Sequence, residues 1–215
     1  MVLEKVKYPR TRHLPWSLGV TNDDVILTST EAFQNRDVIV TEKLDGENTT
    51  LYSDCMHARS LESTFHPSRS WIKAFHGSIK HLIPLGWRIC GENMYAQHTI
   101  KYANLKSYFY IFSIWNEKNE CLNWDDTCEW AQLLGAATPE VLFRGIWNEG
   151  KIRAIQINPQ NCEGYVVRTV KGFPFDHFDR CVAKFVREGH VDETAEHWMY
   201  KELIPNKLLK NSYGS

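Results

Sequence analysis

The chain has 215 residues, of which 43% are hydrophobic and 24% charged, and its formal net charge is −1. This composition is typical of a globular protein with a real core, and the near-neutral charge excludes nucleic-acid binding by bulk electrostatic attraction, so any such contact needs a local patch. The N-terminus lacks the apolar region of a signal peptide, and no run approaches the about 20 apolar residues of a membrane span. We therefore expect a cytoplasmic protein that makes no contact with membranes.

The first third of the chain predicts a lead-in, a pair of strands and a helix. Residues 1–36 carry prolines and no regular pattern, so we expect irregular structure there. Residues 37–41 and 49–53 read as strands, and the charged residues and glycine between them are, taken alone, typical of an exposed hairpin turn. Residues 68–83 place Trp71, Phe75, Ile79 and Leu82 at helical spacing, which predicts an amphipathic helix.

The rest of the chain alternates strands and helices. Residues 124–135 begin with acidic residues and end on a glycine, both signals of a helix. Six cysteines form no C-x-x-C pair, so we expect reduced thiols rather than disulfides or zinc ligands. The mixed order predicts an α+β protein with largely antiparallel sheets. The other expected elements are strands at 86–96, 107–115, 164–170 and 180–186, a short helix at 150–157 and a C-terminal helix at 192–203.

Lys43 directly follows the apolar run Val-Ile-Val-Thr-Glu, an unusual place for a turn lysine. A free lysine has a pKa of about 10.4 and is protonated at neutral pH, so its amine attacks an electrophile only where burial or a nearby cation favours the neutral form. Lys-x-Asp-Gly arises by chance in about one chain of this length in twenty, so the tetrapeptide alone is weak evidence.

Five further segments follow Lys43 in order. They are His-Ala-Arg-Ser at 57–60, Ile-Cys-Gly-Glu-Asn-Met-Tyr-Ala at 89–96, Tyr-Phe-Tyr-Ile-Phe-Ser-Ile-Trp at 108–115, Cys-Glu-Gly-Tyr-Val-Val-Arg at 162–168 and Val-Ala-Lys-Phe-Val-Arg at 182–187. This series resembles the covalent nucleotidyltransferase superfamily of ATP-dependent DNA and RNA ligases and mRNA capping enzymes. With Asn48 five residues after the lysine and the ending of residues 184–202, the pattern is most similar to RNA ligases.

The resemblance implies a nucleotide site. Lys43 would attack the α-phosphorus of ATP and carry AMP, and Glu42 would accept a hydrogen bond from the adenine amino group. Arg59 would bind ribose and phosphate, as a guanidinium binds oxyanions in a bidentate manner. Glu92 would hold a ribose hydroxyl, and Phe112 would stack on the base. Taken singly, these side chains are better explained by structure alone, with Glu92 and Glu163 as strand-end residues, Phe112 as a core residue and Arg59 as a solvated cation.

The resemblance also implies a phosphate and metal site. Glu163 would position Mg²⁺ or Mn²⁺, and Lys184 would neutralise charge on the triphosphate, because phosphoryl transfer needs positioning and charge neutralisation. Asp45 and Asn48 belong with the catalytic residues and would act when RNA ends replace ATP.

Two positions depart from the family pattern. Ser113 stands where many members carry an aspartate, which removes a charge and leaves the role of that position in doubt. The last segment has only Lys184, where the family shows two lysines separated by one residue. Arg187 could replace the second lysine only with a bend, because residues three apart on a strand point to opposite faces.

The resemblance implies the fold of a nucleotidyltransferase (ATP-grasp-like ligase adenylation) domain, with two mainly antiparallel sheets flanked by helices and no OB domain. We expect a single adenylyltransferase domain over 1–215, with a lead-in at 1–36, a catalytic core at 37–200 and a tail at 201–215.

The leading functional hypothesis is an ATP-dependent RNA ligase that joins a 5′-phosphate to a 3′-hydroxyl, with an end-healing or RNA-binding protein as a possible partner. A DNA ligase core, a guanylyltransferase and a catalytically silent nucleotide- or RNA-binding module remain as alternatives. His98 and the pair His190 and His197 could resemble metal ligands. The members of the pair are seven residues apart and so two turns apart on a helix, which favours solvent contact or local hydrogen bonds over a zinc site for them.

Overall fold

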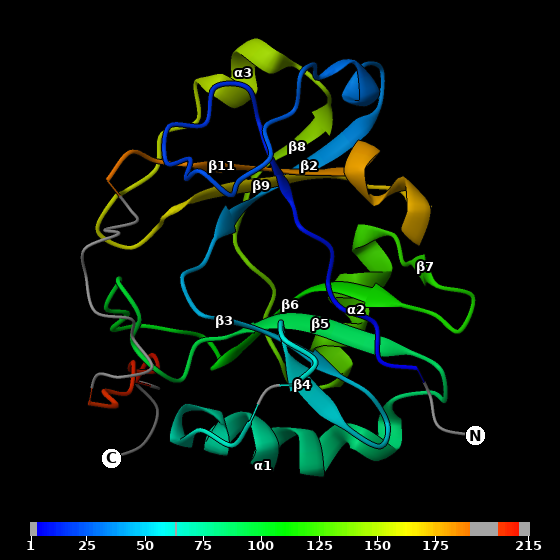
Figure 1. The fold of residues 1–215 in the computed structure, drawn as a ribbon, viewed down its shortest axis with the longest axis vertical. Helices are drawn as coiled ribbons and strands as arrows, with labels where there is room; N and C mark the ends of the chain where they lie inside the picture. The colour runs from blue at the N-terminus through cyan, green and yellow to red at the C-terminus, as the bar shows by residue number, and fades with distance from the viewer. Residues whose placement is uncertain (1–3, 63, 190–201, 211–215) are drawn as a thin grey trace.

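Two sheets lie one above the other in the computed structural model, which describes residues 4–62, 64–189 and 202–210 (Figure 1). The first sheet has the strand order β1–β11–β9–β2–β8, and the second has the order β10–β7–β6–β5–β3–β4. Among the named strands of the described residues, every pairing is antiparallel except that of β1 with β11, which confirms the expected α+β class with largely antiparallel sheets.

The strands of the first sheet are β1 (Arg12–His13), β2 (Asp37–Lys43), β8 (Val141–Ile146), β9 (Gly164–Thr169) and β11 (Val182–Val186). Those of the second are β3 (Glu47–Leu51), β4 (Met56–Ala58), β5 (Arg88–Asn93), β6 (Phe109–Trp115), β7 (Glu120–Cys121) and β10 (Phe173–Pro174). The helices are α1 (Ser70–Ile79), α2 (Trp124–Leu133) and α3 (Glu149–Arg153), with 3₁₀ turns at Glu31–Phe33, Pro67–Arg69, Lys80–Leu82 and Phe175–Arg180.

Helices cover the outer faces of both sheets. Apolar side chains of α1 and α2, among them Ile72 and Ala131, pack with strands β3, β5 and β6 in one core cluster. On the first sheet, Ile152 of α3 packs with Leu14 and Phe33 of the N-terminal segment. A third cluster lies between the sheets at one end, which leaves the other part of the intersheet space for a site.

The predicted helices are found with changed boundaries. Asn123 caps α2 by accepting a hydrogen bond from the Asp126 amide at 2.9 Å, and Gly135, with φ of +68°, follows its end. The predicted helix at 68–83 is α-helical only over Ser70–Ile79. Its last turn is 3₁₀, and Leu82 is 42% exposed, so the expected apolar stripe stops one turn earlier than the sequence indicates.

The prediction of a hairpin over residues 37–53 is wrong. β2 pairs with β8 and β9, whereas β3 pairs with β4 and β5. The three residues between β2 and β3 therefore cross from one sheet to the other, and Lys43 is the last residue of a strand rather than a turn residue.

The N-terminal segment is mostly irregular, as expected, but it is well packed. β1 adds a short parallel strand to β11, and Leu14 is fully buried. Figure 1 shows this segment, in blue, running from one sheet to the other. It therefore forms part of the wall between them.

The remaining expectations concern the cysteines, the C-terminal helix and membrane-spanning segments. All six cysteines are free thiols. The predicted helix at 192–203 falls, except for its last two residues, outside the described residues, as do His190 and His197. Over residues 4–62, 64–189 and 202–210, no helix has the length and apolarity needed to cross a membrane.

Candidate active site

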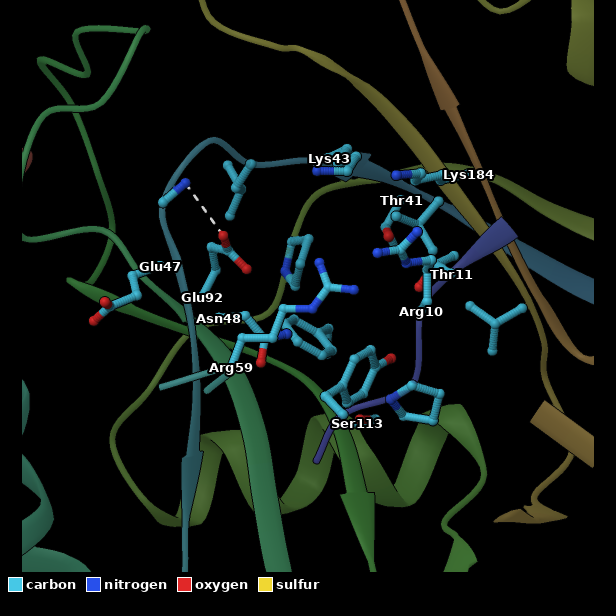
Figure 2. Close-up of a pocket in the computed structure, with 18 of the residues that line it drawn as sticks. Arg10, Thr11, Thr41, Lys43, Glu47, Asn48, Arg59, Glu92, Ser113 and Lys184 are labelled. Atoms are coloured by element: carbon cyan, nitrogen blue, oxygen red, sulfur yellow. Dashed lines mark hydrogen bonds between the residues drawn. The ribbon is translucent and has the colours of Figure 1, made fainter. Parts of the chain in front are cut away.

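A cavity of about 810 Å³ lies between the two sheets, a volume within the usual range for sites that bind small molecules. Its walls come from both sheets and from the N-terminal segment (Figure 2). Seven of the nine site residues expected from the sequence line it, namely Glu42, Lys43, Asn48, Arg59, Glu92, Phe112 and Lys184.

Lys43 ends β2 with its amine inside the site. The Nζ atom contacts Oε1 of Glu163, and the side chain is 27% exposed. Burial lowers the pKa of Lys43, and the nearby Lys184 lowers it further, whereas the carboxylate of Glu92 raises it. The balance favours the neutral, nucleophilic amine more than in a solvated lysine.

Glu163 reaches Lys43 because β2 and β9 pair side by side. Lys43 lies opposite Gly164 in this ladder, and the Glu163 amide donates to the Lys43 carbonyl at 3.3 Å. A Cβ atom on Gly164 would lie 1.9 Å from the Phe185 carbonyl oxygen, so only glycine lets β9 and β11 approach this closely. Glu163 does not line the cavity itself, but its buried carboxylate lies directly behind the amine.

Glu92 and Asn48 are opposite one another on β5 and β3. The Glu92 carboxylate accepts a hydrogen bond from the Gly46 amide at 3.2 Å, drawn in Figure 2. Burial raises the pKa of Glu92 to about 7, although Lys43 opposes that shift. Oδ1 of Asn48 is buried and has no hydrogen-bond partner in the described part of the chain, so it is free to accept from a bound group.

Phe112 and Ser113 bring β6 to the cavity. The Tyr8 ring lies edge-on against Phe112, with centroids 5.2 Å apart. Ser113 is buried and accepts a hydrogen bond from Nε1 of Trp115 at 3.2 Å. Ser113, which stands in the place of the family's aspartate, is thus hydrogen-bonded to a neutral group and adds no charge to the cavity.

Lys184 on β11 is held by an acid that the sequence analysis did not single out. Its Nζ lies 3.2 Å from Oδ1 of Asp24, whose other oxygen accepts from the amide and hydroxyl of Thr21. His13, buried beneath, places Nε2 3.1 Å from the same Oδ1. Burial lowers the pKa of Lys184, and Asp24 opposes that shift.

Arg187 lies outside the cavity lining. Its guanidinium donates to the carbonyl oxygens of Cys162 at 3.3 Å and Pro159 at 3.1 Å. The side chain therefore braces the loop before Glu163. Val182, two residues before Lys184, lines the cavity.

Glu42 and Asp45 already have partners in the protein. Oε1 of Glu42 accepts from the Glu140 amide at 3.3 Å, and burial raises the pKa of this carboxyl. Oδ2 of Asp45 accepts from the amides of Thr99 and Ile100, each at 2.8 Å. Asp45 does not line the cavity, so its contacts assign it to holding the loop that follows β5.

Arg59 and several residues missed by the sequence analysis supply charge at the cavity. Arg59 is exposed and makes no ion pair among the described residues. Lys7 and Arg10 line the cavity from the N-terminal segment, and Arg69 pairs with Glu47 at its other side. Only the density of cations in Lys-Tyr-Pro-Arg-Thr-Arg, residues 7–12, could have indicated the first two.

The described part of the chain holds no zinc-like cluster beside these residues. Among the residues that the structure describes, no group of three or more His, Cys, Asp or Glu side chains could hold a metal ion. His98 lines the cavity with Nδ1 3.9 Å from Oδ1 of Asp45.

Comparison with solved structures shows the same fold in RNA ligases. Naegleria gruberi RNA ligase with PPi is 18% identical over 75% of this chain and 52% of that chain, with a TM-score of 0.53. An archaeal ATP-dependent RNA ligase is 15% identical over 84% of this chain and 48% of that chain, with a TM-score of 0.55. The chain thus spans about half the length of these proteins. No curated protein matches the sequence.

A family model adds evidence from sequence. The model described as RNA ligase matches residues 36–186, which include every site residue expected from the sequence. The resemblance noted from the six short segments is therefore confirmed over most of the chain, and the protein belongs to the RNA ligase family.

Proposed function

We propose that this chain is an ATP-dependent RNA ligase in which Lys43 takes up AMP and passes it to an RNA 5′-phosphate. The observation that carries the proposal is the Lys43 amine, which faces a cavity, has a depressed pKa and lies among Glu163, Glu92 and Lys184. A related Naegleria gruberi RNA ligase carrying K326A was solved with ATP and Mn, which supports the choice of nucleotide.

The first transfer forms a covalent lysyl–AMP. The neutral Lys43 amine attacks the α-phosphorus of ATP, a P–N bond forms, and the P–O bond to pyrophosphate breaks. Glu163, in contact with Nζ, orients the amine, and the nitrogen loses its proton to solvent as the P–N bond forms. Lys184 stabilises the charge that develops on the departing pyrophosphate.

Two further transfers complete the ligation. An oxygen of the RNA 5′-phosphate attacks the α-phosphorus, the P–N bond breaks, and Lys43 regains a proton as it leaves. The 3′-hydroxyl of a second RNA end then attacks the 5′-phosphorus and displaces AMP, losing its proton to solvent. Asn48, with its buried free acceptor, is placed to orient a hydroxyl in these later steps.

The donor set fits a divalent cation bound mainly through phosphates. Glu163 offers one buried carboxylate beside Lys43, and Mg²⁺ or Mn²⁺ is commonly held by one or two carboxylates, waters and substrate phosphates. Glu163 would hold the ion, which would supply charge neutralisation at the phosphates. Glu42, Arg59 and Phe112 would bind adenine, ribose and phosphate, as the family pattern implies.

Incubation with α-labelled ATP and a divalent metal tests the proposal. We expect wild-type protein and Lys118→Ala, an exposed lysine far along the chain, to become labelled and Lys43→Ala to remain unlabelled. Equal labelling of Lys43→Ala and wild type would refute the role of Lys43. ATP binding without label would identify a silent module, and labelling by GTP alone a guanylyltransferase.

A ligation panel then tests the nucleic acid. Labelled enzyme should seal ends with a 5′-phosphate on RNA and leave matched all-DNA ends unsealed, and equal sealing of both would favour a DNA ligase core. A role in RNA repair, a cytoplasmic location and an end-healing partner remain predictions from the sequence.

A further inference from the structure

Four cationic side chains converge on one part of the cavity. Figure 2 shows Arg10 and Arg59 pointing toward the same space from opposite walls, with Lys43 and Lys184 beside it. Arg10 and Arg59 both lower the pKa of Lys184, and Lys184 lowers that of Lys43, so the four charges act on one another. Glu163 and Asp24 pair with the two lysines, whereas the two guanidinium charges have no carboxylate partner among the described residues, so the space between them favours an anion.

Arg10 is available for such an anion. Its Nη1 donates to the carbonyl of Asp23, which anchors the side chain and uses only one of its five donors. Neither Arg10 nor Arg59 has a carboxylate partner among the described residues. Two guanidinium groups on facing walls are suited to grip one phosphate between them.

We propose that Arg10 and Arg59 form a single phosphate clamp, which holds pyrophosphate in the first transfer and the RNA 5′-phosphate in the second. The inference rests on the proposed function and adds a residue of the N-terminal segment to its machinery.

The chemistry requires one shared place for the two phosphates. In phosphoryl-type transfer the attacking and leaving groups lie in line on opposite sides of the phosphorus. Lys43 attacks in the first transfer, so pyrophosphate leaves from the far side as the P–O bond breaks. In the second transfer Lys43 is the leaving group, so the RNA phosphate oxygen must approach from that same far side. Pyrophosphate and the RNA 5′-phosphate therefore exclude one another.

Two half-reactions of the purified lysyl–AMP protein test the role of the clamp separately from the roles of the other site residues. One is the return of ATP on adding pyrophosphate, and the other is the transfer of AMP to 5′-phosphorylated RNA. In Arg10→Gln we expect both single-turnover rates to fall by about 10- to 100-fold, as for loss of a hydrogen bond between charged groups. Arg10→Lys should recover part of both rates, because it keeps the charge but not the fork.

Arg12→Gln is the matched control. Arg12 lies two residues along the same segment, outside the cavity, and forms an exposed pair with Asp179 at 3.3 Å. It should keep both rates. The proposal is overturned if Arg10→Gln behaves like Arg12→Gln, or if it slows one half-reaction and leaves the other unchanged.

Calorimetric titration of the unmodified protein with pyrophosphate gives a readout that needs no catalysis. We expect Arg10→Gln to weaken pyrophosphate binding by about tenfold, the effect of losing one charge-assisted hydrogen bond, while Arg12→Gln does not. Wild-type protein that never forms lysyl–AMP would refute the proposed ligase function alone. Unchanged pyrophosphate binding in Arg10→Gln would refute the clamp.

Discussion

At the scale of single residues, the site depends on how the charge of Lys43 is balanced. Burial and Lys184 favour its neutral amine, whereas the Glu92 carboxylate favours the ammonium form. Glu92 itself has a pKa raised to about 7, so it changes charge near neutral pH. The two groups therefore control jointly the pH range in which the Lys43 amine is neutral.

Glu92→Gln should move the pH dependence of adenylylation to lower pH. The rate rises with pH as Lys43 loses its proton and levels off above its pKa. Removing the negative charge of Glu92 lowers that pKa, because a nearby carboxylate favours the ammonium form. The gap between the two profiles should appear above about pH 7, where Glu92 is charged in the wild type.

Single-turnover label uptake at saturating ATP, measured across pH, separates this shift from weaker nucleotide binding. Glu129→Gln, an exposed carboxylate on α2, serves as the control and should follow the wild-type profile. A rising limb that stays in place or moves to higher pH in Glu92→Gln would contradict the prediction.

The sequence predicted residue types better than residue partners. The order of the short segments was enough to indicate Lys43, Glu92 and Lys184, all of which line the cavity. The sequence could not show that the Asp45 carboxylate accepts hydrogen bonds from the amides of Thr99 and Ile100, because those residues lie over fifty positions away in the chain. Spacing within a motif does not reveal which distant backbone groups occupy its lone pairs.

At the scale of elements, the crossing between β2 and β3 joins the two sheets beside Lys43. The sequence suggested that Gly46 permits a bend, but Gly46 has no positive φ. What requires glycine is space, since a Cβ atom there would lie 2.6 Å from the Asn93 carbonyl oxygen and 3.0 Å from Cγ of Glu92. The crossing is thus pressed against the strand that carries Glu92.

Gly46→Ala should lower both stability and adenylylation. Forcing a methyl group into this contact costs about 1–3 kcal/mol of unfolding free energy and displaces Glu92. Gly150→Ala is the matched control, because the nearest atom to its added Cβ lies at 3.5 Å and alanine suits the interior of α3.

Urea unfolding followed by tryptophan fluorescence, together with label uptake, measures both effects. Gly150→Ala should be as stable as the wild type or slightly more so, with full label uptake. If Gly46→Ala unfolds at the same urea concentration as Gly150→Ala, the crossing is not tightly packed and the argument fails.

The N-terminal segment contains a strand that could not be predicted from the sequence. β1 has only two residues, and its partner β11 lies about 170 positions later. A run this short has no measurable periodicity, and parallel pairing across the chain leaves no local signal. Arg10 and Asp24 were therefore placed in a lead-in, although both line the cavity.

At the scale of the whole molecule, the net charge of −1 hides a local concentration of cations. Lys7, Arg10 and Arg59 are exposed, line the cavity and make no ion pair among the described residues. Nucleic acid approaching this protein meets no general attraction. Its affinity should come from few phosphate contacts, all near the cavity.

The salt dependence of RNA binding measures that number of contacts. For single strands, each neutralised phosphate contributes about −0.7 to the slope of log K against log salt concentration. Three contacts predict a slope of about −2 for 5′-phosphorylated single-stranded RNA, measured by fluorescence anisotropy between about 50 and 200 mM salt. Arg10→Gln should make the slope shallower by about 0.7, whereas Arg12→Gln, outside the cavity, should leave it unchanged. A slope of about −5 or steeper in the wild type would instead place most RNA contacts on a surface beyond the cavity.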